Sequence, residues 1–547
     1  MKEYVVTLRS HDELEDFYND METPGGSITI PNRSCDCSLR RAISRNTHYM
    51  LTEEEASQVK EDPRVLDVIS KDELDSIVTQ PRYSQTSSNW SKSSTPVNSH
   101  VNWGLLRCVN GEQISGWGSN GTTSESGTIT VTSSGKNVDV VIVDGHLNPD
   151  HPEFALNSDG TGGTRVNQYN WYQHTNELGL GSNGTYTYPS GATLENPEDN
   201  HGMHVAGTVC GNTQGWARDS NIYNISPYAN AENPNTLGHT YTFDYVRAFH
   251  ANKSVNSNTG VKNPTICNNS WGSSYTITKS TINSVNWRGT SYTSNLTDNA
   301  TLDSYGLVDT TSTTLYVDAW TTALLADIED AINEGIIMVG AAGNADMKLD
   351  VSGGDDYDNY IVWNTVNTRY YHRGSWNVVA NNSICVGAAS ALTNDSKATF
   401  SQCGPRIDVY APGDNIISCL HDGTVTGGTI TTVTDSRNGS YVLGKYDGTS
   451  MASPQVCGML ACALEQYPRM TPAEAVSYVQ DYSKTSQMFD GGGGYTDADS
   501  LQGSENRYAF YYKERKDSGV LQPRNTFKSR PTTGQVWPRR STLYSKK

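Results

Sequence analysis

Long apolar runs are missing from this 547-residue sequence. Only 35% of its residues are hydrophobic, and no stretch approaches the roughly 18 consecutive apolar residues that a membrane-spanning helix requires. The first residues, MKEYVVTLRSHDELEDF, also lack the apolar segment of a secretory signal. We therefore expect neither a membrane span nor a signal peptide.

The cysteines form no recognisable disulfide framework. Cys35 and Cys37 are one residue apart, too close for an easy mutual bridge, and no second pair has zinc-binding spacing. Five other cysteines lie inside apolar runs, where a thiol acts as a small buried hydrophobic group: Cys210, Cys267, Cys385, Cys457 and Cys462. This usage predicts a reducing compartment, and hence a cytoplasmic or virion-associated protein.

Positive charge is scarce outside the C-terminal end. The formal net charge is −19, yet residues 506–547 carry eleven Lys or Arg against two acids, so the remaining 505 residues carry −28. An acidic body argues against unaided binding to nucleic acid. The basic tail remains a candidate for binding an acidic partner or virion component, or for a solvated extension.

The N-terminal region, residues 1–72, has the pattern of a small α+β domain of ferredoxin-like type. EYVVTL and RVLDVIS indicate strands, HDELEDFYNDM indicates a helix, and Thr52 is placed to cap a second helix, TEEEASQVKEDP. RRAISRNTHYMLT indicates a further strand region. Residues 73–98 are rich in Ser, Thr, Gln and Asn, as in a linker.

Residues 99–485 alternate apolar strands with helical segments, which predicts an α/β fold with a mostly parallel sheet flanked by helices. VDVVIVD (138–144) and GIIMVGAAGN (335–344) are apolar on both faces, as buried parallel strands are. Polar stretches near 155–197, 273–318, 345–380 and 421–446 are expected to be long loops. Residues 486–547, Gly-rich and then basic, are expected to be weakly ordered.

Three polar residues stand where chemistry is often placed. Asp144 ends a buried strand, at the sheet edge where α/β proteins bind ligands. Ser450 opens an apolar helix, where N–H groups favour negative charge. Asn344 ends VGAAGN and is a candidate amide donor to an oxyanion. Each also has an ordinary interpretation, as a turn residue, a helix cap and a turn asparagine respectively.

EDNHGMHVAGT contains two histidines, His201 and His204, separated by two residues. They are a metal pair, a catalytic base with a structural neighbour, or two ordinary side chains. The metal interpretation requires further ligands, such as the glutamate of His-Glu-x-x-His, which this motif lacks. We therefore expect no metal at this position.

Together these segments resemble a known family. VIVDGHLNPDHPEF, HGMHVAGT, VGAAGN and GTSMASP occur in the order Asp, His, Asn, Ser, and the set strongly resembles the subtilisin-like serine peptidases. NNSWGS (268–273) is similar to the family's substrate-binding strand, ATFSQCGPRIDVYAPGDNIIS (398–418) to its strands before the serine, and NWGLLR (102–107) to the start of its mature enzyme. The resemblance covers residues from about 99 to 484.

The resemblance implies a serine endopeptidase. Ser450 would be the nucleophile, His201 the general base, and Asp144 the residue that orients the imidazole, with His204 a structural neighbour. Asn344 would serve the oxyanion hole. No cofactor would be needed for the chemistry, and the partner would be a polypeptide substrate. The substrate-binding residues would be Ser270, Trp271, Gly272, Ala342 and Gly343.

The N-terminal domain resembles the family's inhibitory propeptide, which is cleaved off autocatalytically. The resemblance implies a self-processing zymogen whose own propeptide is a partner, cut between about Leu74 and Asn98. An ordinary appended domain is the alternative. A self-processing or catalytically silent structural protein of a phage particle is the alternative for the whole chain, because the tail, polar loops and thiols would suit a virion.

Several positions depart from the family's pattern. Gly145 and His146 stand where a hydroxyl residue and a glycine are usual, and Met203 replaces a common threonine; we expect activity with an altered pH profile. The stretch 208–217 is too short for the strong calcium loop of many relatives. Structural calcium remains an expectation for the acidic loop 346–360, which is alternatively a solvated loop or a specificity wall that favours basic residues.

Overall fold

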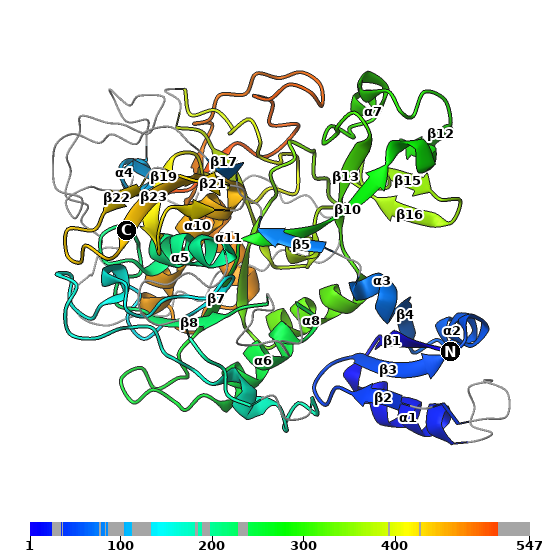
Figure 1. The fold of residues 1–547 in the computed structure, drawn as a ribbon, viewed down its shortest axis with the longest axis horizontal. Coiled ribbons are helices and arrows are strands. Elements are labelled where there is room, and N and C mark those ends of the chain that lie inside the picture. The colour runs from blue at the N-terminus through cyan, green and yellow to red at the C-terminus, as the bar shows by residue number, and fades with distance from the viewer. Residues whose placement is uncertain are drawn as a thin grey trace, which may run out of the picture.

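The computed structural model describes residues 1–23, 34–35, 37–75, 78–81, 84–85, 103–111, 133–180, 184–188, 197–227, 239–391, 394–425, 428–430 and 432–511. They form a small N-terminal unit, a central α/β body and a β-rich region beside it (Figure 1). Within this part of the chain no helix is long and apolar enough to cross a membrane.

The N-terminal unit is a four-stranded antiparallel sheet in the order β2-β3-β1-β4. Two helices cover one face, and their apolar residues, among them Phe17 and Val59, meet Val6 and Tyr49 of the sheet. Thr52 caps the second helix as predicted: its hydroxyl accepts the Glu55 N–H, and the Glu55 carboxylate accepts the Thr52 N–H. The elements are β1 (Lys2–Leu8), η1 (His11–Glu13), α1 (Leu14–Glu22), β2 (Cys37–Arg40), β3 (Asn46–Leu51), α2 (Glu53–Lys60), β4 (Val65–Ser70) and α3 (Lys71–Asp75).

The body is built on an eight-stranded sheet in the order β24-β25-β18-β17-β14-β9-β7-β8, parallel except for the β24–β25 pair. The strands are β7 (Asp139–Val143), β8 (Asn221–Ile225), β9 (Thr265–Asn269), β14 (Ile337–Ala341), β17 (Ile384–Ala389), β18 (Val409–Pro412), β24 (Lys484–Thr485) and β25 (Arg507–Tyr508). The α/β class predicted from the sequence is confirmed.

Helices lie on both faces of this sheet (Figure 1). Val140 and Ile142 of β7 point into one core, and Val141 and Val143 into the other, which explains why the strand is apolar throughout. The first core includes α4 (Trp103–Asn110), α5 (Pro197–Cys210), α10 (Thr449–Gln466) and α11 (Pro472–Tyr482); the second includes α6 (His239–Asn252) and α8 (Thr322–Asn333).

Two regions expected to be long loops instead form a folded β-rich region. It has its own core, including Ile277, Leu302, Leu315 and Ile361. Its strands carry exposed polar residues between the buried ones, so the sequence showed little apolar periodicity. Its elements are β10 (Trp271–Thr278), η5 (Lys279–Thr281), β11 (Ile282–Trp287), β12 (Thr290–Tyr292), α7 (Asn299–Ser304), β13 (Thr314–Ala319), β15 (Tyr360–Trp363) and β16 (Asn367–Tyr370).

The body extends beyond the expected boundary at residue 485. β25 pairs in parallel with β18, and Tyr508 and Tyr511 are buried. Arg107 of α4 lies over the Tyr508 ring, 3.9 Å from its centroid, which ties the C-terminal strand to the start of the body. The expectation of weak order therefore fails for residues 486–511, because their Gly- and Asp-rich composition gave no sign of β25, which lies between β24 and β18. The basic tail from residue 512 lies outside the described residues.

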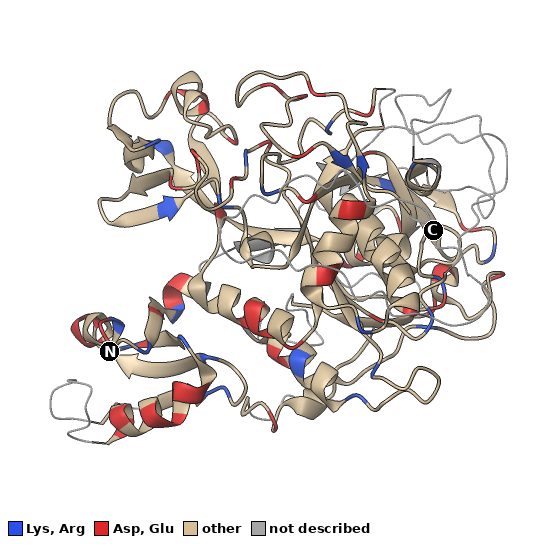
Figure 2. Ribbon diagram, turned by 180° about the vertical axis from the view of Figure 1, so that it is seen from behind, with Lys and Arg blue, Asp and Glu red and all other residues tan. Residues whose placement is uncertain are grey.

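The free face of the N-terminal sheet rests on α6 and α8 (Figure 1). Val5 of β1 and Leu74 of α3 join the apolar core around these helices. At the same interface the Arg41 guanidinium lies between Asp244 and Asp327. Figure 2 shows that acidic residues also lie along α1, α2 and α8. The docking surface thus combines apolar packing with a buried cation held between acids.

Candidate active site

The predicted site residues meet at one edge of the central sheet. Asp144 follows β7, Ser270 follows β9, and Asn344 lies just beyond β14, all at the carboxyl ends of parallel strands. His201 comes from α5 and Ser450 from the first turn of α10. The fold therefore brings together side chains that are up to 306 positions apart in the sequence.

Asp144 and His201 form a buried pair. His201 Nδ1 lies 2.7 Å from Asp144 Oδ1, and both side chains are fully buried. A carboxylate can only accept here, so Nδ1 carries the proton and Nε2 is the basic nitrogen. Gly202 makes this approach possible, because a Cβ at that position would lie 2.3 Å from the Gly145 carbonyl oxygen. The geometry prepares His201 to act as a base through Nε2.

Ser450 is held against Ser270. Its Oγ donates to the Ser270 carbonyl at 2.7 Å, and the Ser270 hydroxyl donates in return to the Ser450 carbonyl at 2.9 Å. Ser453, one turn along α10, lies 2.8 Å from the Ser270 hydroxyl. These bonds fix the helix start beside the strand that the sequence predicted to bind substrate. Ser450 lies in the first turn of α10, the end of a helix whose dipole favours negative charge.

Asn344 is oriented by Thr449, which the sequence did not single out. The Asn344 Oδ1 accepts the Thr449 N–H at 2.9 Å and the Thr449 hydroxyl at 2.8 Å. The same hydroxyl accepts the Gly343 N–H at 3.0 Å. Because Oδ1 is occupied, the amide presents its Nδ2 donor elsewhere, as stabilisation of an oxyanion requires. Ala342 and Gly343 precede Asn344 directly and so form a wall of the same site.

His204 is a structural residue of the core. Its Nε2 lies 2.8 Å from the Ile416 carbonyl, and its ring stacks on Tyr446 with centroids 4.8 Å apart. Burial lowers the pKa of His204 to about 3, so the ring is neutral. His204 thus bonds to a backbone carbonyl, whereas His201 bonds to the Asp144 carboxylate. Among the described residues no cluster of His, Cys, Asp or Glu could hold a metal ion.

A second His–Asp pair adjoins the first. His146, one of the departures noted in the sequence, is buried, and its Nδ1 lies 3.4 Å from Asp199 Oδ1. The same carboxylate oxygen accepts the His146 backbone N–H at 2.8 Å. Asp199 stands two residues before His201, so the imidazole that replaces the usual glycine is tied to the start of α5. Met203, another of these departures, also has a role in the fold, because its sulfur accepts the Asn148 N–H at 3.1 Å.

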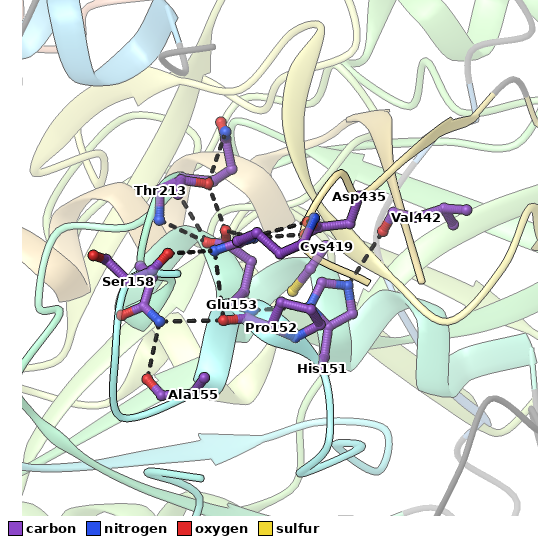
Figure 3. Close-up of polar contacts among 12 residues, drawn as sticks. His151, Pro152, Glu153, Ala155, Ser158, Thr213, Cys419, Asp435 and Val442 are labelled. Atoms are coloured by element: carbon purple, nitrogen blue, oxygen red, sulfur yellow. Dashed lines mark hydrogen bonds and ion pairs between the residues drawn. The ribbon is translucent and has the colours of Figure 1, made fainter. Parts of the chain in front are cut away.

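The short loop after α5 is held by an internal cation (Figure 3). The buried carboxylate of Glu153 accepts the N–H groups of Thr213 and Gln214 and pairs with the Arg437 guanidinium. Burial alone would raise the pKa of Glu153, but Arg437 and Thr213 lower it below its usual range. Arg437 also pairs with Asp435, so the loop near β23 (Val442–Asp447) is fastened to the end of α5.

Several acids of the loop 346–360 are also paired with cations. Asp356 accepts from Arg288 Nε and from Lys348 Nζ, each at 2.7 Å, and these contacts hold its pKa well below its usual range against the opposing effect of burial. Asp350 lies 3.4 Å from Lys348, and Asp346 lies 2.6 Å from Lys397. These three carboxylates are therefore used in ion pairs within the fold.

The chain's own N-terminal segment lies along the predicted substrate-binding strand (Figure 1). β5 (Val78–Pro81) pairs antiparallel with β10, with Pro81 opposite Trp271 and Gln80 opposite Gly272. β6 (Ser84–Gln85) pairs with the end of β23, where Ser84 is opposite Asp447. Asp447 stands three residues before Ser450. Two strands that follow the N-terminal unit therefore pair beside the site, β5 with β10 next to Ser270 and β6 with β23 just before Ser450.

Comparison with known proteins identifies the family. The model of the subtilase family, a family of peptidases, matches residues 135–510, so the chain belongs to the subtilase family. An extracellular protease of Xanthomonas campestris pv. campestris is 34% identical over 111 residues, covering 20% of this chain and 17% of that protein. Subtilisin E of Bacillus subtilis is 31% identical over 153 residues, covering 28% and 30%. The matched stretches thus span less than a third of these curated relatives.

Solved structures of the same kind are similar at low identity. A cold-adapted subtilisin-like serine proteinase is 18% identical with a TM-score of 0.42, and the match covers 75% of this chain and 98% of that one. Fervidolysin from Fervidobacterium pennivorans, a keratinolytic enzyme related to subtilisin, is 16% identical with a TM-score of 0.46, covering 92% and 60%.

Proposed function

We propose that this protein is a serine endopeptidase that acts through Ser450, His201 and Asp144. The observation that carries the proposal is the 2.7 Å contact between His201 Nδ1 and Asp144 Oδ1, beside a serine at the start of a buried helix. If Ser450 were only a helix cap and Asp144 only a turn residue, their roles would not require them to lie near His201. The combination is the one that activates a hydroxyl for attack on a carbonyl.

The chemistry follows from these positions. The Ser450 hydroxyl turns from the Ser270 carbonyl towards His201 Nε2, which takes its proton as Oγ attacks the peptide carbonyl. Asp144 stabilises the imidazolium. The oxyanion is met by the Ser450 backbone N–H and by Asn344 Nδ2, whose orientation Thr449 fixes. His201 then protonates the leaving amine, and water hydrolyses the acyl-enzyme.

A polypeptide substrate would bind as an extended strand. β10 offers an edge at Trp271 and Gly272, and β5 already uses it in antiparallel register. Ala342 and Gly343 would flank the substrate on the other side. Backbone pairing of this kind gives affinity for any extended chain, so side-chain preference must come from the walls of the site.

We also propose that the chain is made as a zymogen that cuts itself between Pro81 and Ser84. β5 ends at Pro81 beside Trp271, and β6 begins at Ser84 beside Asp447. β10 begins directly after Ser270, which contacts Ser450, and β23 ends three residues before Ser450, so we infer that the bond presented to the nucleophile falls between β5 and β6. This narrows the window of about Leu74 to Asn98 that the sequence predicted.

The test is the intact mass of the purified wild type beside Ser450→Ala. We expect the wild type to yield an N-terminal fragment ending between residues 81 and 83, while the variant stays whole. A fluorophosphonate label on wild-type Ser450 would support the nucleophile independently. Fragments of the same size in both proteins would point to a host protease, and an unlabelled, uncut wild type would contradict the proposal.

A further inference from the structure

Asp318 is a buried acid on the strand that flanks β10. It belongs to β13, is 3% exposed, and lies opposite Ser274 in the β10–β13 register. β10 carries β5 on its other edge. Asp318 is therefore part of the same three-stranded sheet as the segment that occupies the substrate position.

The Asp318 side chain lies on the side of the sheet that faces the nucleophile. Side chains alternate along a strand, so positions 270, 272 and 274 share one face, and Asp318, opposite Ser274, shares it too. The Ser270 hydroxyl identifies this face, because it donates to the Ser450 carbonyl at 2.9 Å. Trp271 points the other way and donates its indole N–H to the Val143 carbonyl at 2.8 Å.

Gln402 links Asp318 to the opposite wall of the site. Its Nε2 donates to Asp318 Oδ2 at 2.7 Å, and its backbone N–H donates to the Gly343 carbonyl at 3.0 Å. Gln402 is fully buried. Gln402 thus orients the Asp318 carboxylate through its side-chain amide and connects it, through its own backbone, to residues 342–344.

The β5 register says which substrate residue meets this face. If a substrate pairs with β10 as β5 does, the residue that follows the one opposite Trp271 lies opposite Ser270. Because side chains alternate along a strand, the side chain of that substrate residue points towards the face that carries Asp318. That residue supplies the carbonyl presented to Ser450. In this protein's own sequence, the residue after Pro81 is Arg82.

We propose that Asp318 makes the site select a basic residue, arginine or lysine, on the acyl side of the bond that is cut. This inference rests on the proposed peptidase function. A guanidinium or ammonium group brought to a buried carboxylate gains charge-assisted hydrogen bonds, whereas an apolar side chain gains none. The acid that sets specificity is then on β13, outside the loop 346–360 that the sequence suggested.

The test compares the processed wild type with processed Asp318→Asn on two fluorogenic peptides, Gln-Pro-Arg and Gln-Pro-Leu amides. We expect the wild type to prefer arginine, and Asp318→Asn to lower the arginine-to-leucine ratio of kcat/KM by about a hundredfold. Asp303→Asn, a half-buried acid in α7, is the matched control and should keep the wild-type ratio. Benzamidine, a guanidinium mimic, should compete with the peptides in the wild type.

The outcomes separate the two proposals. Equal cleavage of both peptides by the wild type, or an unchanged ratio in Asp318→Asn, would overturn the assignment of Asp318 while leaving a working peptidase. No cleavage of either peptide, with Ser450 unlabelled by fluorophosphonate, would overturn the peptidase function and this inference with it. If Asp318→Asn fails to fold, the wild-type preference and competition by benzamidine decide the matter, and absence of both would reject it.

Discussion

Arg41 of the N-terminal unit is completely buried against Asp327 of α8, with its guanidinium 3.0 Å from the carboxylate, and its other close partner is Asp244 of α6 at 2.7 Å. One cation thus ties the N-terminal sheet to both helices beneath it. Ser44 and Asn46, on the same segment, also bond to Asp327. The two units are therefore joined by directed polar contacts as well as by apolar packing.

Replacing Arg41 should loosen the docking of the N-terminal unit. Arg41→Ala removes the cation from the buried Asp327 and leaves Asp244 with Arg247 at 3.8 Å. We expect a loss on the order of 3–5 kcal/mol, so the processed N-terminal fragment should bind the body at least about a hundredfold more weakly. Gel filtration after processing measures the fraction that stays bound. Lys60→Ala, which removes an exposed ion pair with Asp67 inside the N-terminal unit, is the control and should change little. Equal retention of both variants would count against this role for Arg41.

Asn344→Ala should slow turnover more than it weakens substrate binding. The amide contributes mainly when charge develops on the substrate oxygen, so kcat should fall by about 10² to 10³ while KM changes little. Thr449→Val removes the hydroxyl that holds Asn344 but keeps the backbone N–H, so its loss should be smaller. Steady-state kinetics with a peptide amide would show the order, and a Thr449→Val loss that exceeds that of Asn344→Ala would refute it.

Acid should destabilise the protein through His204. Burial lowers the pKa of His204 to about 3, whereas an unfolded chain has a histidine pKa near about 6.5. The unfolded state therefore binds a proton that the folded state refuses. The contribution of His204 to the free energy of unfolding is complete above about pH 6.5. It is lost as the pH falls towards 3, by up to about 1.4 kcal/mol per pH unit.

Melting of uncleaved Ser450→Ala between pH 7 and 4 measures this effect. Adding His204→Phe keeps a ring to stack on Tyr446 and removes the titration, so the Tm of that protein should fall less steeply with acid. Parallel curves for the two proteins would show that His204 is not the group responsible.

Arg437→Met should lower stability strongly, because it leaves the Glu153 carboxylate buried without its cation. We expect a loss on the order of 3–5 kcal/mol, read as a lower Tm in the Ser450→Ala background. Adding Glu153→Gln should restore part of it, since the buried charge is then gone while the amide oxygen still accepts from Thr213 and Gln214. A double variant no more stable than Arg437→Met alone would disprove this account.

The candidate site could be proposed from the sequence because its motifs are short and occur in an order that resembles the subtilisin-like peptidases. Asp144, Asn344 and Ser450 each end or begin an apolar element within a few residues, and such junctions are visible in the sequence. Taken singly, the same junctions fit a turn residue, a helix cap and a turn asparagine equally well. Thr449 and Asp199 lie inside the same motifs, but their roles depend on partners across the fold. Their contacts with Asn344 and His146 could not be inferred from spacing.

Long-range ion pairs left no trace in the sequence. Arg437 meets Glu153 across 284 positions, and Arg41 meets Asp327 across 286. Neither arginine stands in a periodic apolar pattern, so nothing local marks it as buried. The β-rich region was predicted as loops for a related reason. Its strands expose many polar residues, and the sequence does not show that Ile277 and Leu315 share a core.

The surface on which the N-terminal unit docks is separate from β5 and β6, and this separation affects how fast activity would appear. The proposed cut between Pro81 and Ser84 would break one covalent link and would leave the contacts of Val5, Leu74 and Arg41 with α6 and α8 in place. The onset of the proposed activity would then depend on dissociation of two polypeptides: it should be slow in concentrated solution and rise on dilution below the dissociation constant of the pair. The fragment would act as a reversible dose regulator, whose supply is fixed at one molecule per enzyme by synthesis on the same chain.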